Sequence, residues 1–67
     1  MIASYMLSEA GIIRYDKPGA SPELKIKELW GKNGTFIYKD DNGYYTLNEA
    51  NRIDLNTIEV IKELLNI

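Results

Sequence analysis

An acidic turn is the part of the sequence whose residue types could do chemistry most directly. Asp40, Asp41 and Asn42 offer side-chain oxygen atoms at consecutive positions, and oxygen is the ligand that Mg²⁺ and Ca²⁺ prefer. A metal ion held by Asp40 and Asp41 would permit metal-assisted cleavage of a phosphodiester, such as the nicking of supercoiled DNA. These residues lack the spacing of an EF-hand loop, and Asp and Asn also favour turns because they bond their own backbone. Both interpretations of the turn stay open.

Basic and aromatic side chains give a second candidate, a surface that binds single-stranded nucleic acid. If residues 24–30 form a regular strand, two lysines share one face, and aromatic residues of neighbouring strands could stack bases beside them. Lysines at this spacing also protect edge strands from aggregation, and aromatic residues in so small a sheet often belong to the core. The residues predicted to contact nucleic acid are Lys25, Lys27, Trp30, Lys39 and Arg52.

The composition limits the other kinds of chemistry. The 67 residues include no cysteine and no histidine, so thiolate ligands, disulfides and the usual neutral-pH general base are absent. The glycines stand singly, without the spacing of a phosphate-binding loop. The net charge of −2 does not by itself indicate a nucleic-acid binder. Without cysteine or a long apolar segment, we expect a cytoplasmic protein of a host cell that does not span a membrane.

Short apolar segments separated by turn residues predict an antiparallel β-meander of about four strands over residues 24–55. Asn33-Gly34 is the strongest turn signal, because a type I′ hairpin turn needs positive φ at both central positions. Residues 40–43 repeat the signal, and the strand between the two turns, 35–39, should be central because both of its faces carry apolar atoms. Glu28 falls on the apolar face of its strand, which suggests a β-bulge near Glu28-Leu29.

The segments on either side of the meander complete the single domain, residues 1–67. Residues 1–23 are expected to form strands at 1–7 and 12–15 and then a loop. Residues 48–51 are polar and fit a loop or a turn of helix, and a last short strand then leads into a C-terminal helix over residues 56–66.

Three start signals and a wide apolar surface characterise the predicted helix. Asn56 is the predicted N-cap, Glu59 at N3 completes a capping box, and Leu55 faces Val60 as a hydrophobic staple. Ile58, Ile61 and Leu65 can rest on the sheet, which leaves a second apolar stripe that a small sheet does not cover. We therefore expect a homo-oligomer, a dimer or larger, whose interface contains Val60, Leu64 and Ile67.

The predicted α+β architecture, an antiparallel meander followed by one helix, resembles the PC4-like single-stranded-DNA-binding fold of transcriptional coactivators. The resemblance covers residues 24–66, and its motif is Ile53-Asp54-Leu55-Asn56 at the junction of strand and helix. It implies dimerisation through the helices and nucleic-acid binding on the sheet. Some small PC4-like proteins of mobile elements are also associated with opposing CRISPR nucleases. The basic residues that the family carries before this motif are reduced here to Arg52.

Three functions follow as hypotheses. The first is a homo-oligomeric PC4-like phage or mobile-element protein that acts on nucleic acid or on a host nucleic-acid-processing machine of the CRISPR type. The second is an inhibitor that binds a host enzyme and has no affinity for DNA. The third is a nuclease that uses Mg²⁺ at the acidic turn to nick DNA.

Overall fold

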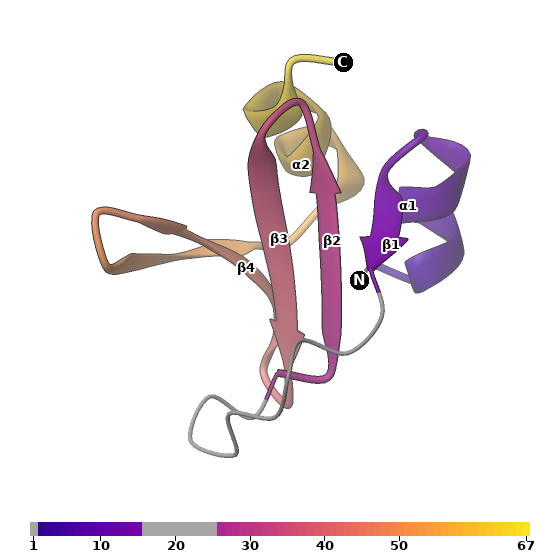
Figure 1. Ribbon diagram of the computed structural model, residues 1–67. Coiled ribbons are helices and arrows are strands. Elements are labelled where there is room, and N and C mark those ends of the chain that lie inside the picture. Colours follow the sequence, from indigo (N-terminus) through magenta and orange to yellow (C-terminus); the bar gives the residue numbers. More distant parts are fainter. Residues whose placement is uncertain (1, 16–25) are drawn as a thin grey trace.

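The structure, a computed structural model, describes residues 2–15 and 26–67, and Figure 1 shows the arrangement of its elements. The fold is α+β, as predicted. In chain order its elements are α1 (Ser4–Glu9), β1 (Ile13–Tyr15), β2 (Glu28–Lys32), β3 (Thr35–Asp40), β4 (Gly43–Asn48), β5 (Asn51–Leu55) and α2 (Ile58–Leu65). The predicted loop over residues 16–23 and the start of the predicted strand at 24–30 lie outside the described residues.

The strands form one antiparallel sheet in the order β1-β2-β3-β4-β5, so it has five strands where the sequence predicted about four. The hairpin at Asn33-Gly34 is confirmed: both residues have positive φ, 52° and 80°, as a type I′ turn requires. The central position of β3 is confirmed as well. These turns are local features, and adjacent strands simply follow one another along the chain.

The predicted β-bulge near Glu28-Leu29 is wrong. The pairing of β2 with β3 is regular from Glu28 opposite Lys39 to Lys32 opposite Thr35. Glu28 therefore stays on the face that carries Trp30. Its carboxylate accepts hydrogen bonds there from Trp30 and Tyr44, which removes the need to turn it outward.

Both helices cover one face of the sheet, and the core lies between. In Figure 1, β2 and β3 lie in front of α2, while α1 lies beside β1. Side chains that alternate along the strands point into this core and meet Leu7 of α1 and Ile61 and Leu65 of α2. The sheet and the segment before β1 contribute Ile12, Trp30, Ile37, Tyr44 and Leu55. The opposite face, described below, has no helix on it among the described residues.

The N-terminal strand predicted at residues 1–7 is wrong, because Ser4–Glu9 forms α1. The helix ends in a Schellman motif, in which the Ile12 amide donates to the Leu7 carbonyl and the Gly11 amide to the Ser8 carbonyl. Gly11 has φ +82°, a conformation that costs glycine little. The pair Gly11-Ile12 was thus the sequence signal for a helix end. The apolar residues before it favour a strand only when this signal is ignored.

The start of α2 also differs from the prediction. The N-cap is Thr57, whose hydroxyl accepts a hydrogen bond from the Val60 amide at 3.3 Å. Glu59 consequently stands at N2, so the predicted capping box with Asn56 is absent. Leu55 is buried as the last residue of β5, whereas Val60 is exposed, so the predicted staple is absent too. Asn56 connects the end of β5 at Leu55 to the N-cap at Thr57.

Replacing the cap gives a direct test of this start. Thr57→Ala is expected to cost about 1 kcal/mol of unfolding free energy and to lower the melting temperature by several degrees, because the Val60 amide loses its acceptor. Asn56→Ala serves as the matched control and should change the melting temperature much less. Thermal unfolding followed by circular dichroism measures both. A larger loss of melting temperature in Asn56→Ala than in Thr57→Ala would show that Asn56 is the N-cap.

The turn between β4 and β5 is made by residues that disfavour its geometry. Residues 48–51 form neither a long loop nor a helical turn, because Glu49 and Ala50 alone connect the strands, with φ of 51° and 70°. Left-handed backbone costs a non-glycine residue about 1–2 kcal/mol. The double substitution Glu49→Asn and Ala50→Gly is therefore expected to raise the unfolding free energy by about 1 kcal/mol. Denaturant unfolding measures the change, and a destabilised variant would contradict this turn geometry.

Candidate functional site: an exposed aromatic face

The sheet face opposite the helices carries exposed apolar and aromatic side chains. These residues alternate in sequence with the core residues, so they share the other face. We call this set the open face, and it consists of the exposed residues Ile13, Tyr15, Phe36 and Leu47 with the half-buried Tyr38 and the buried Tyr45. The Tyr15 and Phe36 rings lie 5.9 Å apart between centroids, and the Tyr38 and Tyr45 rings stack at 5.4 Å. Exposed apolar surface of this kind is typical of binding sites.

Gly31 lets two of these rings lie over β2. A Cβ atom at this position would come within 2.9 Å of Tyr15 Cε2 and 3.1 Å of Phe36 Cδ1. Beside the rings is a hollow of about 260 Å³, lined by Ile13, Tyr15, Phe36 and the residues of the β2-β3 turn. The absence of a side chain at Gly31 thus shapes the open face.

Arg52 connects three strands at the other side of the open face. Its guanidinium lies 4.0 Å from the centre of the Tyr45 ring and binds both carboxylate oxygens of Asp40, at 2.7 and 3.3 Å. Its Nε donates to Asp54 at 2.8 Å. The hydrogen bond from Arg52 lowers the pKa of Asp40, and burial, together with the Asp40 charge, raises the pKa of Tyr45. Arg52 therefore ties β5 to β3 across β4.

The residues predicted to contact nucleic acid do not gather on one surface. Trp30 is 2% exposed and lies in the core, so its ring cannot receive a base. Lys27 pairs with Asp41 at 2.6 Å, and Lys39 pairs with Glu28 at 3.5 Å. Arg52 pairs with Asp40 and Asp54, and Lys25 lies outside the described residues. Each predicted cation that is described thus faces a carboxylate of this chain.

The acidic turn is occupied by the same ion pairs. Asp40 binds Arg52 and accepts a hydrogen bond from the Asn42 amide at 2.8 Å, while Asp41 binds Lys27. Within residues 2–15 and 26–67, no three acidic, histidine or cysteine side chains come close enough to hold a metal ion. The hydrogen bond to Asn42 is the local turn chemistry that Asp commonly supplies.

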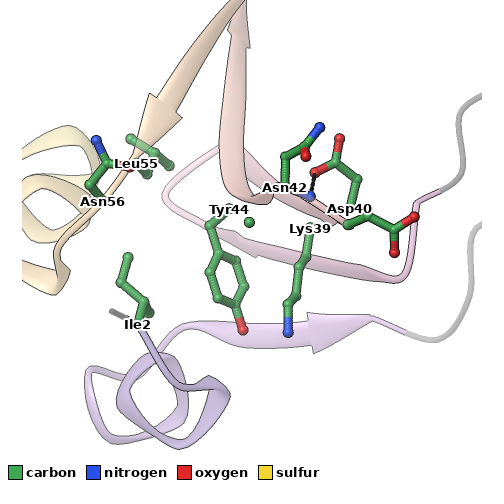
Figure 2. A pocket seen from close by; sticks show the side chains of 9 residues that line it. Ile2, Lys39, Asp40, Asn42, Tyr44, Leu55 and Asn56 are labelled. Atoms are coloured by element: carbon green, nitrogen blue, oxygen red, sulfur yellow. Dashed lines mark hydrogen bonds between the residues drawn. The ribbon is translucent and has the colours of Figure 1, made fainter.

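A cavity of about 340 Å³ lies between this turn and the segments that precede the two helices, and Figure 2 shows its lining. The Lys39 and Tyr44 side chains extend side by side on one part of its wall, while Ile2, Leu55 and Asn56 lie across from the turn. The Lys39 ammonium lies 5.3 Å from the centre of the Tyr44 ring. Because this ammonium is already paired with Glu28, the cavity offers a ligand no free charge from Lys39.

Glu28 is a half-buried acid whose role the sequence pattern did not reveal. One oxygen accepts hydrogen bonds from Trp30 Nε1 at 2.9 Å and from the Tyr44 hydroxyl at 3.1 Å, and the other faces Lys39. Burial alone would raise the pKa of Glu28, but the two hydrogen bonds and the charges of Lys39 and Arg14 hold it below its ordinary value. Burial and the Glu28 charge raise the pKa of Tyr44. These contacts join β2, β3 and β4, so the role of Glu28 is to stabilise the sheet.

The outer stripe of α2 is exposed, as the sequence indicated. Ile61 and Leu65 are buried and Ile58 is half-buried against the core. We call Val60, Leu64 and Ile67 the helix flank; their exposed fractions are 41%, 39% and 47%. The C-terminal end of α2 is fixed to the sheet by the side-chain amide of Asn33, whose Nδ2 donates to the Leu65 carbonyl at 2.8 Å. The helix flank is thus a rigid apolar surface without a partner inside the described chain.

Comparison with known proteins finds no matching family model, no matching curated protein and no matching solved structure. None of the helices described is both long and apolar enough to cross a membrane.

Proposed function

We propose that this chain acts by binding another protein, through the open face of its sheet. The observation that supports the proposal most directly is the exposed group Ile13, Tyr15 and Phe36, held over Gly31 beside a hollow. Aromatic side chains on a rigid sheet supply large contact areas at low cost in conformational entropy. The target proposed here is a host enzyme, and the PC4-like resemblance favours one that processes nucleic acid.

The charge distribution favours a protein partner over nucleic acid. Binding to phosphates requires cations that can release counterions, but Lys27, Lys39 and Arg52 are each neutralised by a carboxylate within the chain. The overall charge of −2 adds a weak repulsion. An interface core poor in charge and rich in aromatic rings is instead typical of contacts between proteins.

Self-association through the helix flank forms the second part of the proposal. Burying an aliphatic side chain contributes about 1.5–3 kcal/mol, and a second copy of α2 offers a surface of matching chemistry. A symmetric pair would cover Val60, Leu64 and Ile67 on both copies at once. It would leave the open face, on the other side of the sheet, accessible to a target.

The experiment compares capture of host proteins by the unmodified chain and by Tyr15→Ser/Phe36→Ser. We expect a defined protein to be retained by the unmodified chain and lost with the variant, because the open face loses its two most exposed rings. Tyr5→Ser is the matched control, since Tyr5 is more exposed than either ring but lies on α1. Retention of the same protein by the double variant would refute the open face as the binding site.

A second candidate, binding of single-stranded nucleic acid, is favoured by one specific observation. The exposed Tyr15 and Phe36 rings lie side by side on the open face, and stacking on aromatic rings binds bases without sequence preference. This is the function that the PC4-like resemblance implies. A salt-dependent gel shift with single-stranded DNA that weakens in Tyr15→Ser/Phe36→Ser would favour this candidate over the first.

A further inference from the structure

The free edge of β5 has an unusual sequence for an edge strand. β5 ends the sheet, and its residues Asn51–Asp54 are exposed. Edge strands commonly carry lysine, proline or charges of one sign, which discourage pairing with another strand. β5 has neither lysine nor proline, and its two charged residues, Arg52 and Asp54, have opposite signs and flank the exposed Ile53.

The hairpin geometry determines which backbone groups this edge presents. Asn48 and Asn51 flank a two-residue turn and therefore form a hydrogen-bonded pair. Such pairs alternate with non-hydrogen-bonded pairs along an antiparallel ladder. Ile53, opposite Thr46, thus bonds to β4, whereas the N–H and C=O groups of Arg52 and Asp54 point away from the sheet. Four strong hydrogen-bonding groups at the centre of the edge thus have no backbone partner among the residues that the structure describes.

The segment Arg52-Ile53-Asp54 is complementary to itself in the antiparallel direction. When a second copy of β5 is placed against the first with Ile53 opposite Ile53, Arg52 of each copy stands opposite Asp54 of the other. The same register pairs the outward N–H and C=O groups of Arg52 with those of Asp54. Arg52 already pairs with Asp40 and Asp54 of its own chain, so Asp54 of the second copy would extend this network, and opposite charges directly across an antiparallel pair stabilise it. Charge and hydrogen bonding therefore select the same register.

We propose that β5 pairs with β5 of a second copy of this chain, on a two-fold axis through Ile53, and joins the two sheets into one. Because the axis is perpendicular to the sheet, both copies place their helices on the same face. Ile53 points to that face, as does the neighbouring core residue Leu55. The pairing does not depend on the proposed target of the open face.

Substitution on the axis tests the pairing with high specificity. Ile53→Lys and Ile53→Glu each place two like charges directly opposite one another, at the closely spaced non-hydrogen-bonded position. Each variant alone is expected to weaken the association step that β5 contributes at least about tenfold, while association through the helix flank remains. An equimolar mixture of the two should associate again, because lysine then faces glutamate. Sedimentation of each sample across a dilution series measures this, with circular dichroism as the check on folding.

A charge on the same hairpin but off the axis is the matched control. Leu47→Lys, as exposed as Ile53 but on the open face of β4, should leave association unchanged. Cysteine provides a second measurement, since the chain has none: Ile53→Cys should form an interchain disulfide rapidly and Leu47→Cys slowly. Association of Ile53→Lys equal to that of the unmodified chain, or a mixture that fails to recover, would overturn the β5 pairing. Either result would leave the capture experiment on Tyr15 and Phe36 unaffected.

Discussion

Leu64→Glu is expected to break the association through the helix flank, while pairing through β5 remains, and to lower the melting temperature sharply. Leu64 is the middle member of the helix flank and is 39% exposed in the single chain. A glutamate there would bring two buried charges together in a symmetric pair of helices. A 67-residue domain buries only about 60% of the surface of its unfolded chain, so loss of the association is expected to leave a marginal core. Light scattering and thermal unfolding measure the two effects.

The control is Lys62→Glu, which adds negative charge on the solvent side of the same helix. It should leave the mass unchanged and lower the melting temperature by a few degrees at most, because Lys62 favours the C-terminal end of the helix dipole. The unmodified chain is expected to scatter with at least twice its monomer mass of 7.7 kDa at micromolar concentration. A mass of 7.7 kDa that stays constant on dilution would contradict self-association through this flank.

Local sequence signals predicted most of the sheet, because the β2-β3 and β3-β4 turns are set by residues adjacent in the chain, whereas Glu49 and Ala50 gave no such signal for the β4-β5 turn. Asn33-Gly34 set one hairpin, whereas the shared face of Trp30 and Ile37 follows from the observed register of β2 and β3. The N-terminal helix was missed because its residues are β-permissive and its termination signal, Gly11, resembles an ordinary turn glycine. Thr57 rather than Asn56 caps α2 because burial of Leu55 extends the strand to that residue. Tertiary burial thus decided between two adjacent capping residues.

The candidate site was less predictable, because it depends on which residues face each other across strands. The sequence shows where the charged residues stand in the chain. Pairing Arg52 with Asp40 could be predicted only with the knowledge that β3 and β5 flank β4. Trp30 was expected on a binding surface and lies instead in the core. The position of Glu28 on an apolar face did depart from the usual strand pattern, but it marks a hydrogen-bonded carboxylate and not the predicted β-bulge. Its explanation, a carboxylate that serves Trp30 and Tyr44, could come only from the register.

Glu28→Ala is expected to be among the most destabilising substitutions in the chain. It leaves Trp30 Nε1 and the Tyr44 hydroxyl without their shared acceptor, and a buried donor left unpaired costs about 1–3 kcal/mol. It also leaves Lys39 without its carboxylate. Denaturant unfolding at neutral pH measures the loss, and tryptophan fluorescence reports on Trp30 directly. A loss of unfolding free energy no larger than that of an ordinary surface substitution would mean that water replaces the carboxylate at little cost.

Glu28→Gln separates the charge from the hydrogen bonds. Its amide oxygen can still accept from Trp30 and Tyr44, so the variant should lose less stability than Glu28→Ala, and the loss should depend on pH. The pKa of Glu28 is lowered on folding from its ordinary value of 4.5, so the ionised group stabilises the fold fully above that pH. This contribution disappears as the pH falls through the lowered pKa of the folded state. The difference in unfolding free energy between the unmodified chain and Glu28→Gln should therefore be constant near neutral pH and shrink in acid below about pH 4.5. A difference that stays the same into strong acid would show that the Glu28 charge does not contribute, and would reduce its role to that of a neutral acceptor.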